Sequence, residues 1–273
     1  EVIYKMKKVV TKAFAKINLS LDVLGKLENG YHEVQMAMQT VSVFDLVTVT
    51  KIKSGIELST NLPYLPIDNN NIAYRAAEEF FKYTGIKEGV SIDISKRIPV
   101  GAGLAGGSSN ASAVLKAMNK LFGAGLSLKE LCKIGVNLGA DVPYCILGGT
   151  RLAEGIGEKL SPLPKFPKCS IVLVKPSFSI STKTVYEKID SYKDYKRPQT
   201  QKLIEGLHAS DMEIITGAMG NVLEEVSLSE HPILQKVKDE LMELGAVHAQ
   251  MSGSGPTVFG IFSNMEEARN AKK

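Results

Sequence analysis

The sequence predicts an α+β fold in two lobes. Three observations support this prediction: a strongly alternating strand near the N-terminus, several segments with helical spacing, and strands and helices that follow one another without regular βαβ alternation. With 273 residues the chain is long enough to bury a large core, as one large domain or two small ones. We place the division between the lobes at residue 160, which gives segments 1–160 and 161–273.

Charge and cysteine content argue against several classes of protein. The 33 basic and 29 acidic residues give a net charge of +4, which is too mild to predict nucleic-acid binding. Cys132, Cys145 and Cys169 form no C-x-x-C or Cys/His cluster, so we expect neither a zinc site nor a disulfide framework. No apolar run reaches the ~18 residues of a membrane span, and no signal peptide is visible. The residues before Met6 are either an added segment or the sign of an alternative start. We expect a cytoplasmic protein without a membrane partner.

The first strand is defined by its alternation. Apolar residues occupy every second position from Ala13 to Val23, and Lys16 and Asn18 share the opposite, polar face. Gly25 and the turn at residues 28–30 end this strand. The same reasoning predicts strands at 39–52, 56–59 and 90–96 and an amphipathic helix at 71–83.

The second part of the chain is less regular. Ser127 and Glu130 are spaced as a capping box, which predicts the start of a helix at 127–137. The lysine-rich segment 190–201 is typical of an exposed loop. Further helices are predicted at 109–122, 200–208, 211–219, 232–244 and 265–273, and further strands at 144–154, 169–175 and 257–262.

A glycine-rich loop precedes the predicted helix at residue 109. The stretch from Pro99 to Ser109 contains G-x-G-x-x-G but no lysine after its glycines, which excludes a Walker A loop, and no second strand follows, which excludes a dinucleotide fold. Its four glycines let backbone amides approach an anion, and the helix start adds unpaired amides. Ser108 and Ser109 are placed to reach a phosphate or its Mg²⁺, or to cap the helix of a plain glycine-rich turn.

Pro99–Ser109 resembles the phosphate loop of the GHMP kinases, the family of galactokinase, homoserine kinase and mevalonate kinase. The stretches 138–143 (LGADVP) and 251–257 (MSGSGPT) resemble two further motifs of the family, and 13–19 (AFAKINL) and 30–33 (GYHE) add specific matches. The resemblance implies a two-lobed fold, with an N-terminal lobe like ribosomal protein S5 domain 2 and a ferredoxin-like C-terminal lobe. It also implies ATP with Mg²⁺ as cofactors, with ATP in the lobe 1–160 and the substrate side in 161–273.

The resemblance further implies site residues. Lys16 and Asp141 match the catalytic pair. From the residues alone, a lysine on a solvated strand face is the favoured interpretation of Lys16, and a capping aspartate is as good an interpretation of Asp141 as a catalytic one. Asp141 would orient the substrate hydroxyl and accept its proton late, while Lys16 would stabilise the developing charge. The ATP-binding positions are Asn71, Lys96, Pro99, Gly101, Gly103, Leu104, Gly106, Gly107, Ser108 and Ser109. The substrate-binding positions are Asn18, Tyr31, His32, Thr182, Tyr186, Gly253, Ser254 and Gly255.

Gly30-Tyr31-His32 narrows the resemblance to family members that phosphorylate an alcohol carrying a cytidine diphosphate group, on a route to isoprenoid precursors. The cytosine would stack on Tyr31 and hydrogen-bond to His32, with Tyr186 as a second aromatic wall. A kinase for homoserine or mevalonate and a noncatalytic RNA-binding module are the alternatives. Ala105 and Asn110 depart from the family's loop, the metal ligands are unknown, and the active form is a monomer or a homodimer.

Overall fold

The computed structural model describes residues 7–192 and 195–272. The residues before Met6, two residues of the predicted loop 190–201 and the last residue of the predicted helix 265–273 lie outside this range. The described chain forms two compact units that are discontinuous in sequence. Unit 1 contains residues up to Ala15, 41–99 and 105–148, and unit 2 contains 16–40, 100–104 and 149–273. The sequence predicted two lobes that follow one another along the chain, whereas each of the first two strands is divided between the two units. A lobe boundary at residue 160 stays a prediction.

Unit 1 is built on a sheet whose register aligns its apolar residues. Val49 faces Ile92 in an antiparallel pair, and Leu58 faces Ile92 in a parallel pair. Since side chains alternate along a strand, this register puts all three on one face. The strands are β1 (Lys8–Lys26), β2 (His32–Ile52), β3 (Ile56–Thr60) and β4 (Gly89–Ser95), and all four were predicted.

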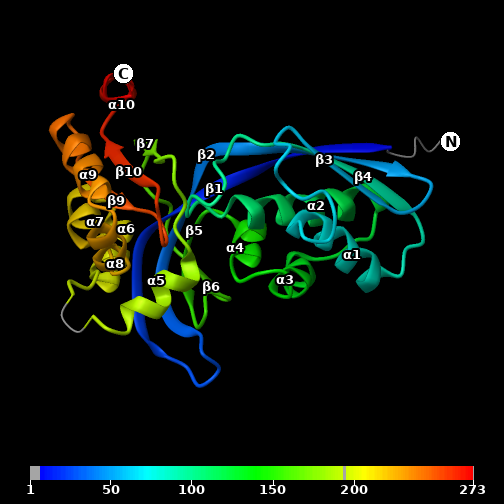
Figure 1. Cartoon of the computed structure of the whole chain (residues 1–273), viewed down its shortest axis with the longest axis horizontal. Coiled ribbons are helices and arrows are strands. Elements are labelled where there is room, and N and C mark those ends of the chain that lie inside the picture. Colours follow the sequence, from blue (N-terminus) through cyan, green and yellow to red (C-terminus); the bar gives the residue numbers. More distant parts are fainter. Residues whose placement is uncertain (1–6, 193–194, 273) are drawn as a thin grey trace. The chain divides into compact units, whose positions relative to one another are not determined.

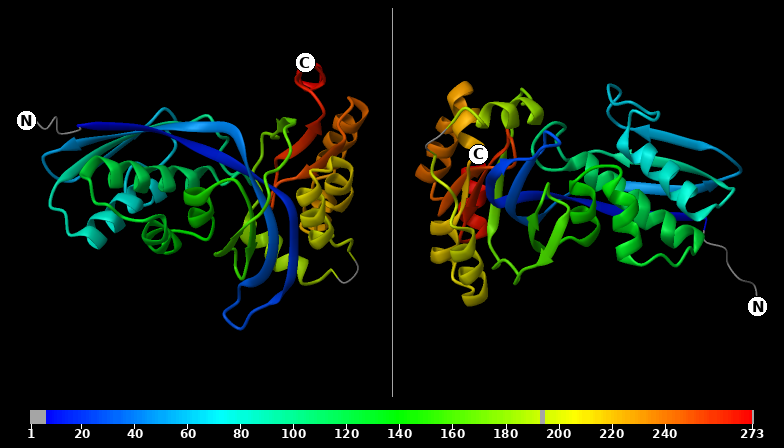
Figure 2. Two further views of the ribbon diagram at one scale, coloured as in Figure 1. Left: turned by 180° about the vertical axis from the view of Figure 1, so that it is seen from behind. Right: turned by 90° about the horizontal axis from the view of Figure 1, so that it is seen from below.

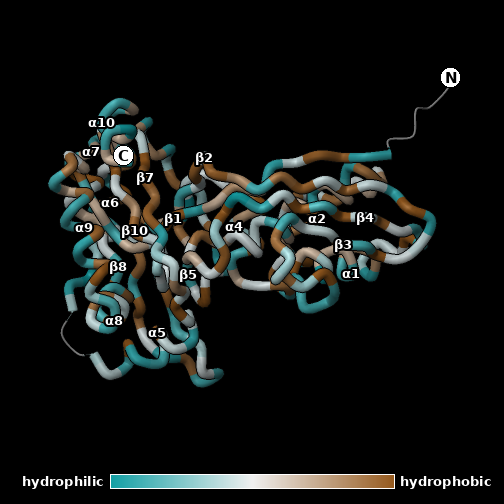
Figure 3. The backbone as a smooth tube through the Cα atoms, turned by 45° about the horizontal axis from the view of Figure 1, so that its top comes forward, coloured by the Kyte–Doolittle hydropathy of each residue, from teal (hydrophilic) through white to brown (hydrophobic). Residues whose placement is uncertain are grey.

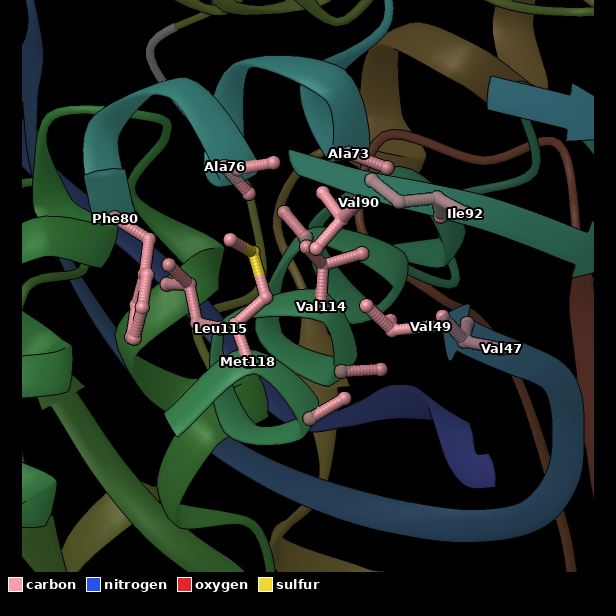
Figure 4. Close-up of a cluster of buried hydrophobic side chains, with 14 of the residues drawn as sticks. Val47, Val49, Ala73, Ala76, Phe80, Val90, Ile92, Val114, Leu115 and Met118 are labelled. Carbon is pink, nitrogen blue, oxygen red and sulfur yellow. The ribbon is translucent and has the colours of Figure 1, made fainter. Parts of the chain in front are cut away.

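Four helices cover one face of this sheet (Figure 1). They are α1 (Ile72–Thr84), α2 (Gly106–Phe122), α3 (Leu128–Val136) and α4 (Asp141–Leu147). Figure 4 shows the core between sheet and helices, where Phe80, Val114 and Met118 pack against Val49 and Ile92. The predicted capping box at the start of α3 is confirmed.

Unit 2 contains a smaller antiparallel sheet and all six remaining helices of the described residues. Its sheet has the order β7-β10-β9, with β10 buried along its whole length. In Figure 3 the hydrophobic colour follows strands such as β7, and Figure 2 shows the C-terminal helices in yellow and orange gathered together. The elements are β5 (Thr150–Glu154), β6 (Lys159–Pro162), β7 (Ser170–Val174), α5 (Thr182–Ile189), α6 (Thr200–Ala209), α7 (Met212–Ala218), β8 (Gly220–Asn221), α8 (Glu224–Glu230), α9 (Ile233–Glu243), β9 (His248–Met251), β10 (Val258–Phe262) and α10 (Met265–Ala271).

The prediction of a strand from 144 to 154 was wrong in its first half. Residues up to Leu147 belong to α4, and only β5 is a strand. Tyr144 and Ile146 favour a strand by propensity, but they pack as the buried side of a helix, and tertiary packing overrides propensity here. Pro143 is compatible with this helix because it lies in the first turn. The sequence analysis also missed β6, α5, β8, α8 and β9, which are short.

Candidate active site

The helix after the glycine loop begins earlier than predicted. α2 starts at Gly106 rather than at Ser108 or Ser109, and its N-cap is Ala105, which makes no side-chain capping bond. The Ser109 hydroxyl instead donates to the Phe14 carbonyl at 2.6 Å, so the interpretation of this serine as an N-cap is wrong. The amides of Gly106, Gly107 and Ser108 therefore have neither an intrahelical acceptor nor a side-chain cap, which is the arrangement that binds anions.

Ala105 is under backbone strain. Its φ of 55° lies in the left-handed region, which among the described non-glycine residues only Ser210 shares. An L-residue in this region costs roughly 1–2 kcal/mol. The family's glycine at this position would relieve that strain, so the departure noted in the sequence has a physical consequence.

We expect Ala105→Gly to raise the free energy of unfolding by about 0.5–1 kcal/mol. The relief of left-handed strain exceeds the ~0.4–1 kcal/mol by which the more flexible unfolded chain opposes it. Urea denaturation measures the change. The control is Ala209→Gly, at the exposed last residue of α6, where the more flexible unfolded chain opposes folding and no left-handed strain is relieved, so stability should fall. A loss of stability in both variants would contradict the strain at Ala105.

Lys16 is a buried cation in unit 2. It is 5% exposed, and its Nζ donates to Asn18 Oδ1 at 2.7 Å and to the Gly103 carbonyl at 3.3 Å. Among the described residues both acceptors are neutral, so no carboxylate within this unit balances the charge. A buried, unbalanced ammonium is costly unless it serves an anionic ligand or a functional partner. The polar face predicted for β1 is therefore buried rather than solvated.

The glycine run after β9 lies directly against the first glycine loop. A Cβ on Gly103 would lie 2.2 Å from the Ser252 carbonyl oxygen, so only glycine fits at this position. The Ser252 hydroxyl also donates to the Gly103 carbonyl at 3.0 Å. Asn221 fixes the backbone of this glycine run, because its Nδ2 donates to the carbonyls of Met251 and Gly253 at 2.9 and 2.8 Å. Two motifs that are about 150 residues apart are thus brought together within unit 2.

Glu224 supports the same glycine run, and sequence reasoning missed it. Its Oε1 accepts the Met251 amide at 2.7 Å, and its Oε2 pairs with Lys238 at 2.7 Å. Burial raises the pKa of this carboxyl, and the Lys238 charge opposes that rise. Glu224 begins a helix that was itself not predicted, so no pattern singled it out.

Four of the predicted substrate residues lie close together in two pairs. The Thr182 and Ser254 hydroxyls are 2.8 Å apart, and the rings of His32 and Tyr186 are 5.3 Å apart between centroids. His32 is buried, whereas Tyr31 is 61% exposed and presents its ring to solvent. An exposed ring beside a buried polar ring is suited to a planar base that stacks on one and hydrogen-bonds to the other.

Asp141 and Asn71 each stand at the start of a helix in unit 1. Asp141 is the half-buried first residue of α4, and its carboxylate has no hydrogen-bond partner among the described residues. Asn71 is the N-cap of α1: it accepts from the Ala73 amide at 3.0 Å and donates to the Pro66 carbonyl at 2.8 Å. The carboxylate of Asp141 is therefore available to a ligand, while each polar atom of the Asn71 side chain already makes one hydrogen bond.

Lys96 lies beside the first turn of α2 in a buried ion pair. Its Nζ is 2.5 Å from Asp45 Oδ2 and 3.0 Å from Asn110 Oδ1, and a Cβ on Gly106 would lie 3.3 Å from it. Asp45 is fully buried and also accepts the amides of Arg97 and Ile98. This aspartate fixes the segment that leads into the glycine loop.

Asp45 was missed, although a signal existed. It shares the inward face of its strand with Val47 and Val49, where an acidic residue is out of place unless it has a partner. Asn110, one of the departures from the family's loop, is part of this cluster, because its Nδ2 donates to Asp45 Oδ2 at 2.8 Å.

The predicted site residues divide between the two units. Unit 1 carries Asn71, Lys96, Pro99, Gly106, Gly107, Ser108, Ser109 and Asp141. Unit 2 carries Lys16, Asn18, Tyr31, His32, Gly101, Gly103, Leu104, Thr182, Tyr186, Gly253, Ser254 and Gly255. Most ATP positions thus lie in unit 1, and all the predicted substrate positions lie in unit 2.

Comparison with known proteins identifies the class. The N-terminal domain model of the GHMP kinases matches residues 71–149, and the C-terminal model matches residues 203–273. The chain belongs to the GHMP kinase family, which confirms the predicted fold class, and ATP is the phosphate donor that a kinase of this family uses. Among the described residues no helix is long and apolar enough to cross a membrane.

Individual relatives narrow the comparison to one kind of kinase. A protein of Clostridium kluyveri named 4-diphosphocytidyl-2-C-methyl-D-erythritol kinase is 49% identical over 96% of this chain and 93% of that protein. One of the same name from Alkaliphilus metalliredigens is 49% identical over 97% and 92%. A crystal structure of 4-(cytidine 5'-diphospho)-2C-methyl-D-erythritol kinase superposes with a TM-score of 0.83 at 33% identity, covering 96% of this chain and 93% of the other.

Proposed function

We propose that this chain transfers the γ-phosphoryl group of ATP to the 2-hydroxyl of 4-diphosphocytidyl-2-C-methyl-D-erythritol, a step of the non-mevalonate route to isoprenoid precursors. Relatives of that name, matched over more than nine-tenths of the chain, support the substrate. The observation that carries the chemistry is Lys16, a buried ammonium whose partners in its own unit are neutral. A phosphoryl group in transfer supplies the negative charge that such a cation stabilises.

Lys16 and Asp141 form the proposed catalytic pair. Phosphoryl transfer depends on positioning and charge stabilisation more than on covalent chemistry. A carboxylate with a pKa near ~4 is a weak base for a free alcohol. We therefore assign Asp141 to orient the hydroxyl and to accept its proton as the bond to phosphorus forms. Lys16 stabilises the charge that develops on the oxygens.

The ATP phosphates are assigned to the loop from Pro99 to Ser109, within the proposed ATP lobe 1–160. Mg²⁺ prefers to keep several waters and to bind substrate phosphates with few protein ligands. Among the described residues no cluster of three metal-ligating side chains exists. In the described part of the chain the Ser108 hydroxyl has no hydrogen-bond partner, whereas the Ser109 hydroxyl donates to the Phe14 carbonyl. The ion would neutralise charge on the phosphates.

We expect Gly107→Ala to weaken ATP binding without lowering the stability of the fold. Its Cβ would meet only Ile72 Cγ2 at 3.4 Å, an ordinary contact, and alanine in a helix is worth roughly 0.5–1 kcal/mol over glycine. A methyl group at the phosphate-binding turn should nevertheless raise the KM for ATP at least about tenfold, since a loss of ~1.4 kcal/mol is tenfold in affinity. Gly217→Ala, at an exposed position in α7, is the control and should gain stability without any change in this KM. An unchanged KM in Gly107→Ala would remove this turn from the ATP site.

The cytidine end of the substrate is assigned to Tyr31, His32 and Tyr186, within the proposed substrate lobe 161–273 and the hairpin of β1 and β2. Thr182 and the run from Gly253 to Gly255 would hold the diphosphate and the alcohol. A kinase for homoserine or mevalonate is the alternative, but these substrates contain no base that would use the rings at 31, 32 and 186. Action as a monomer or homodimer, without nucleic acid and in the cytoplasm, stays a prediction.

The substrate assignment is tested by ADP release with Mg-ATP and three alcohols: the cytidine diphosphate substrate, homoserine and mevalonate. We expect turnover with the first alone. Turnover with either of the others would keep the kinase and overturn the cytidine pocket. Binding to a nucleic-acid column that weakens steeply with salt, without any turnover, would support the RNA-binding alternative instead.

A further inference from the structure

Only one of the two ring nitrogens of His32 makes a hydrogen bond with the described residues. His32 begins β2, its side chain is 4% exposed, and its Nε2 lies 2.7 Å from Asp190 Oδ1. Asp190 directly follows α5, the helix that carries Tyr186. Nδ1 has no hydrogen-bond partner among the described residues. One ring nitrogen is thus committed, and the other is available to a ligand.

In the hydrogen bond with Asp190, Nε2 of His32 must be the donor. A carboxylate offers only acceptors, so Nε2 carries the hydrogen, and a neutral ring then has its lone pair at Nδ1. Lys26, at the end of β1, pairs with the other oxygen of Asp190 at 2.7 Å. Hydrogen bonds from Lys26 and then from His32 lower the pKa of Asp190, which keeps it ionised.

We propose that Asp190, held by Lys26, is a positioning residue that fixes the tautomer of His32 and thereby selects cytosine over uracil. This inference rests on the proposed function. Cytosine has an exocyclic amine, which donates a hydrogen bond, at the position where uracil has a carbonyl, which accepts one. The lone pair on Nδ1 of His32 accepts a hydrogen bond from the cytosine amine. It forms no hydrogen bond with the uracil carbonyl, because both groups are acceptors. Tyr186, with its ring 5.3 Å from that of His32, places a stacking surface beside the same edge.

Kinetics with two substrates tests the selection. The wild type, Asp190→Asn and Asp190→Ala are compared with the cytidine substrate and with its uridine analogue. The asparagine amide can donate as well as accept, and alanine can do neither. Neither variant therefore fixes the hydrogen of His32 on Nε2. We expect kcat/KM for the cytidine substrate to fall at least about tenfold through KM, with kcat little changed, and the cytosine preference to shrink by a similar factor. Since an unpaired acceptor in a binding site is disfavoured, the wild type should discriminate strongly.

The matched control is Glu230→Gln. Glu230, the last residue of α8, pairs at the surface with Lys188 of α5, the helix that Asp190 follows. The variant therefore removes an ion pair of α5 that does not involve His32. Its cytosine preference should equal that of the wild type. An unchanged preference in both Asp190 variants would overturn the inference alone. A wild type that does not phosphorylate the cytidine substrate would overturn the proposed function and this inference together.

Nitrogen NMR of the imidazoles gives a readout that needs no substrate. The chain contains four histidines, so the His32 signals are assigned by their absence in His32→Gln. We expect the wild type to show a protonated Nε2 and an unprotonated Nδ1, and both Asp190 variants to show averaged signals of the two tautomers. Identical spectra in the wild type and Asp190→Ala would overturn the role of Asp190.

Discussion

Asp141→Asn is expected to lower kcat by roughly 10²–10⁴ with a modest change in the KM of either substrate. The amide keeps the size of the side chain but cannot accept the proton that the hydroxyl loses. A loss confined to kcat is the sign of an interaction made in the transition state rather than in substrate binding. Steady-state kinetics of the folded variant measures both constants.

Asp239→Asn is the control for this change. Asp239 lies at the surface of α9, where it accepts from Gln235, so the same substitution there should leave kcat unaltered. Near-normal kcat in Asp141→Asn would remove this residue from the mechanism. A large rise in KM with unchanged kcat would instead make Asp141 a binding residue.

Asp45→Asn is expected to lower the free energy of unfolding by about 3–5 kcal/mol, because removing one partner of a buried pair leaves the other charge uncompensated. Asp45 is fully buried, and its pair with Lys96 is excluded from solvent as well. The variant also weakens the bonds that hold the amides of Arg97 and Ile98 before the glycine loop. Urea denaturation measures the loss, and we expect weaker ATP binding with it.

Two further variants keep this prediction testable if Asp45→Asn does not fold. The double variant Asp45→Asn with Lys96→Met removes both charges, so it should recover a large part of the lost stability. Asp93→Asn, on β4, where the carboxylate accepts an exposed hydrogen bond from Ser59 of β3, should change stability by less than about 0.5 kcal/mol. A double variant that is less stable than Asp45→Asn would contradict the account of a buried pair.

Local signals in the sequence predicted much of this molecule. The period-two pattern placed Lys16 and Asn18 on one face of β1, and the spacing of Ser127 and Glu130 placed the start of α3, because both signals act over a few residues. The glycines of the loop from Pro99 to Ser109 predicted an anion site for the same reason. That the polar face of β1 is buried required the rest of unit 2, which the pattern does not contain.

Long-range partners explain what could not be predicted. Asp45 is defined by Lys96 and Asn110, which lie 51 and 65 positions further along the chain. Asp190 was grouped with an exposed loop, and only the fold brings it to His32, 158 positions away. The residues of α4 favour a strand by themselves and form a helix because of what they pack against. Side-chain chemistry that depends on tertiary contacts leaves little trace in local sequence.

We expect the γ-phosphoryl group of ATP to be transferred to the 2-hydroxyl of the cytidine diphosphate substrate. Phosphorus NMR of the reaction mixture tests it most directly. The carbon that bears this hydroxyl also bears the methyl group and no hydrogen, so the new phosphate ester should give a singlet without proton coupling as ADP accumulates. A multiplet would place the phosphate on a different hydroxyl, and release of inorganic phosphate alone would contradict the transfer.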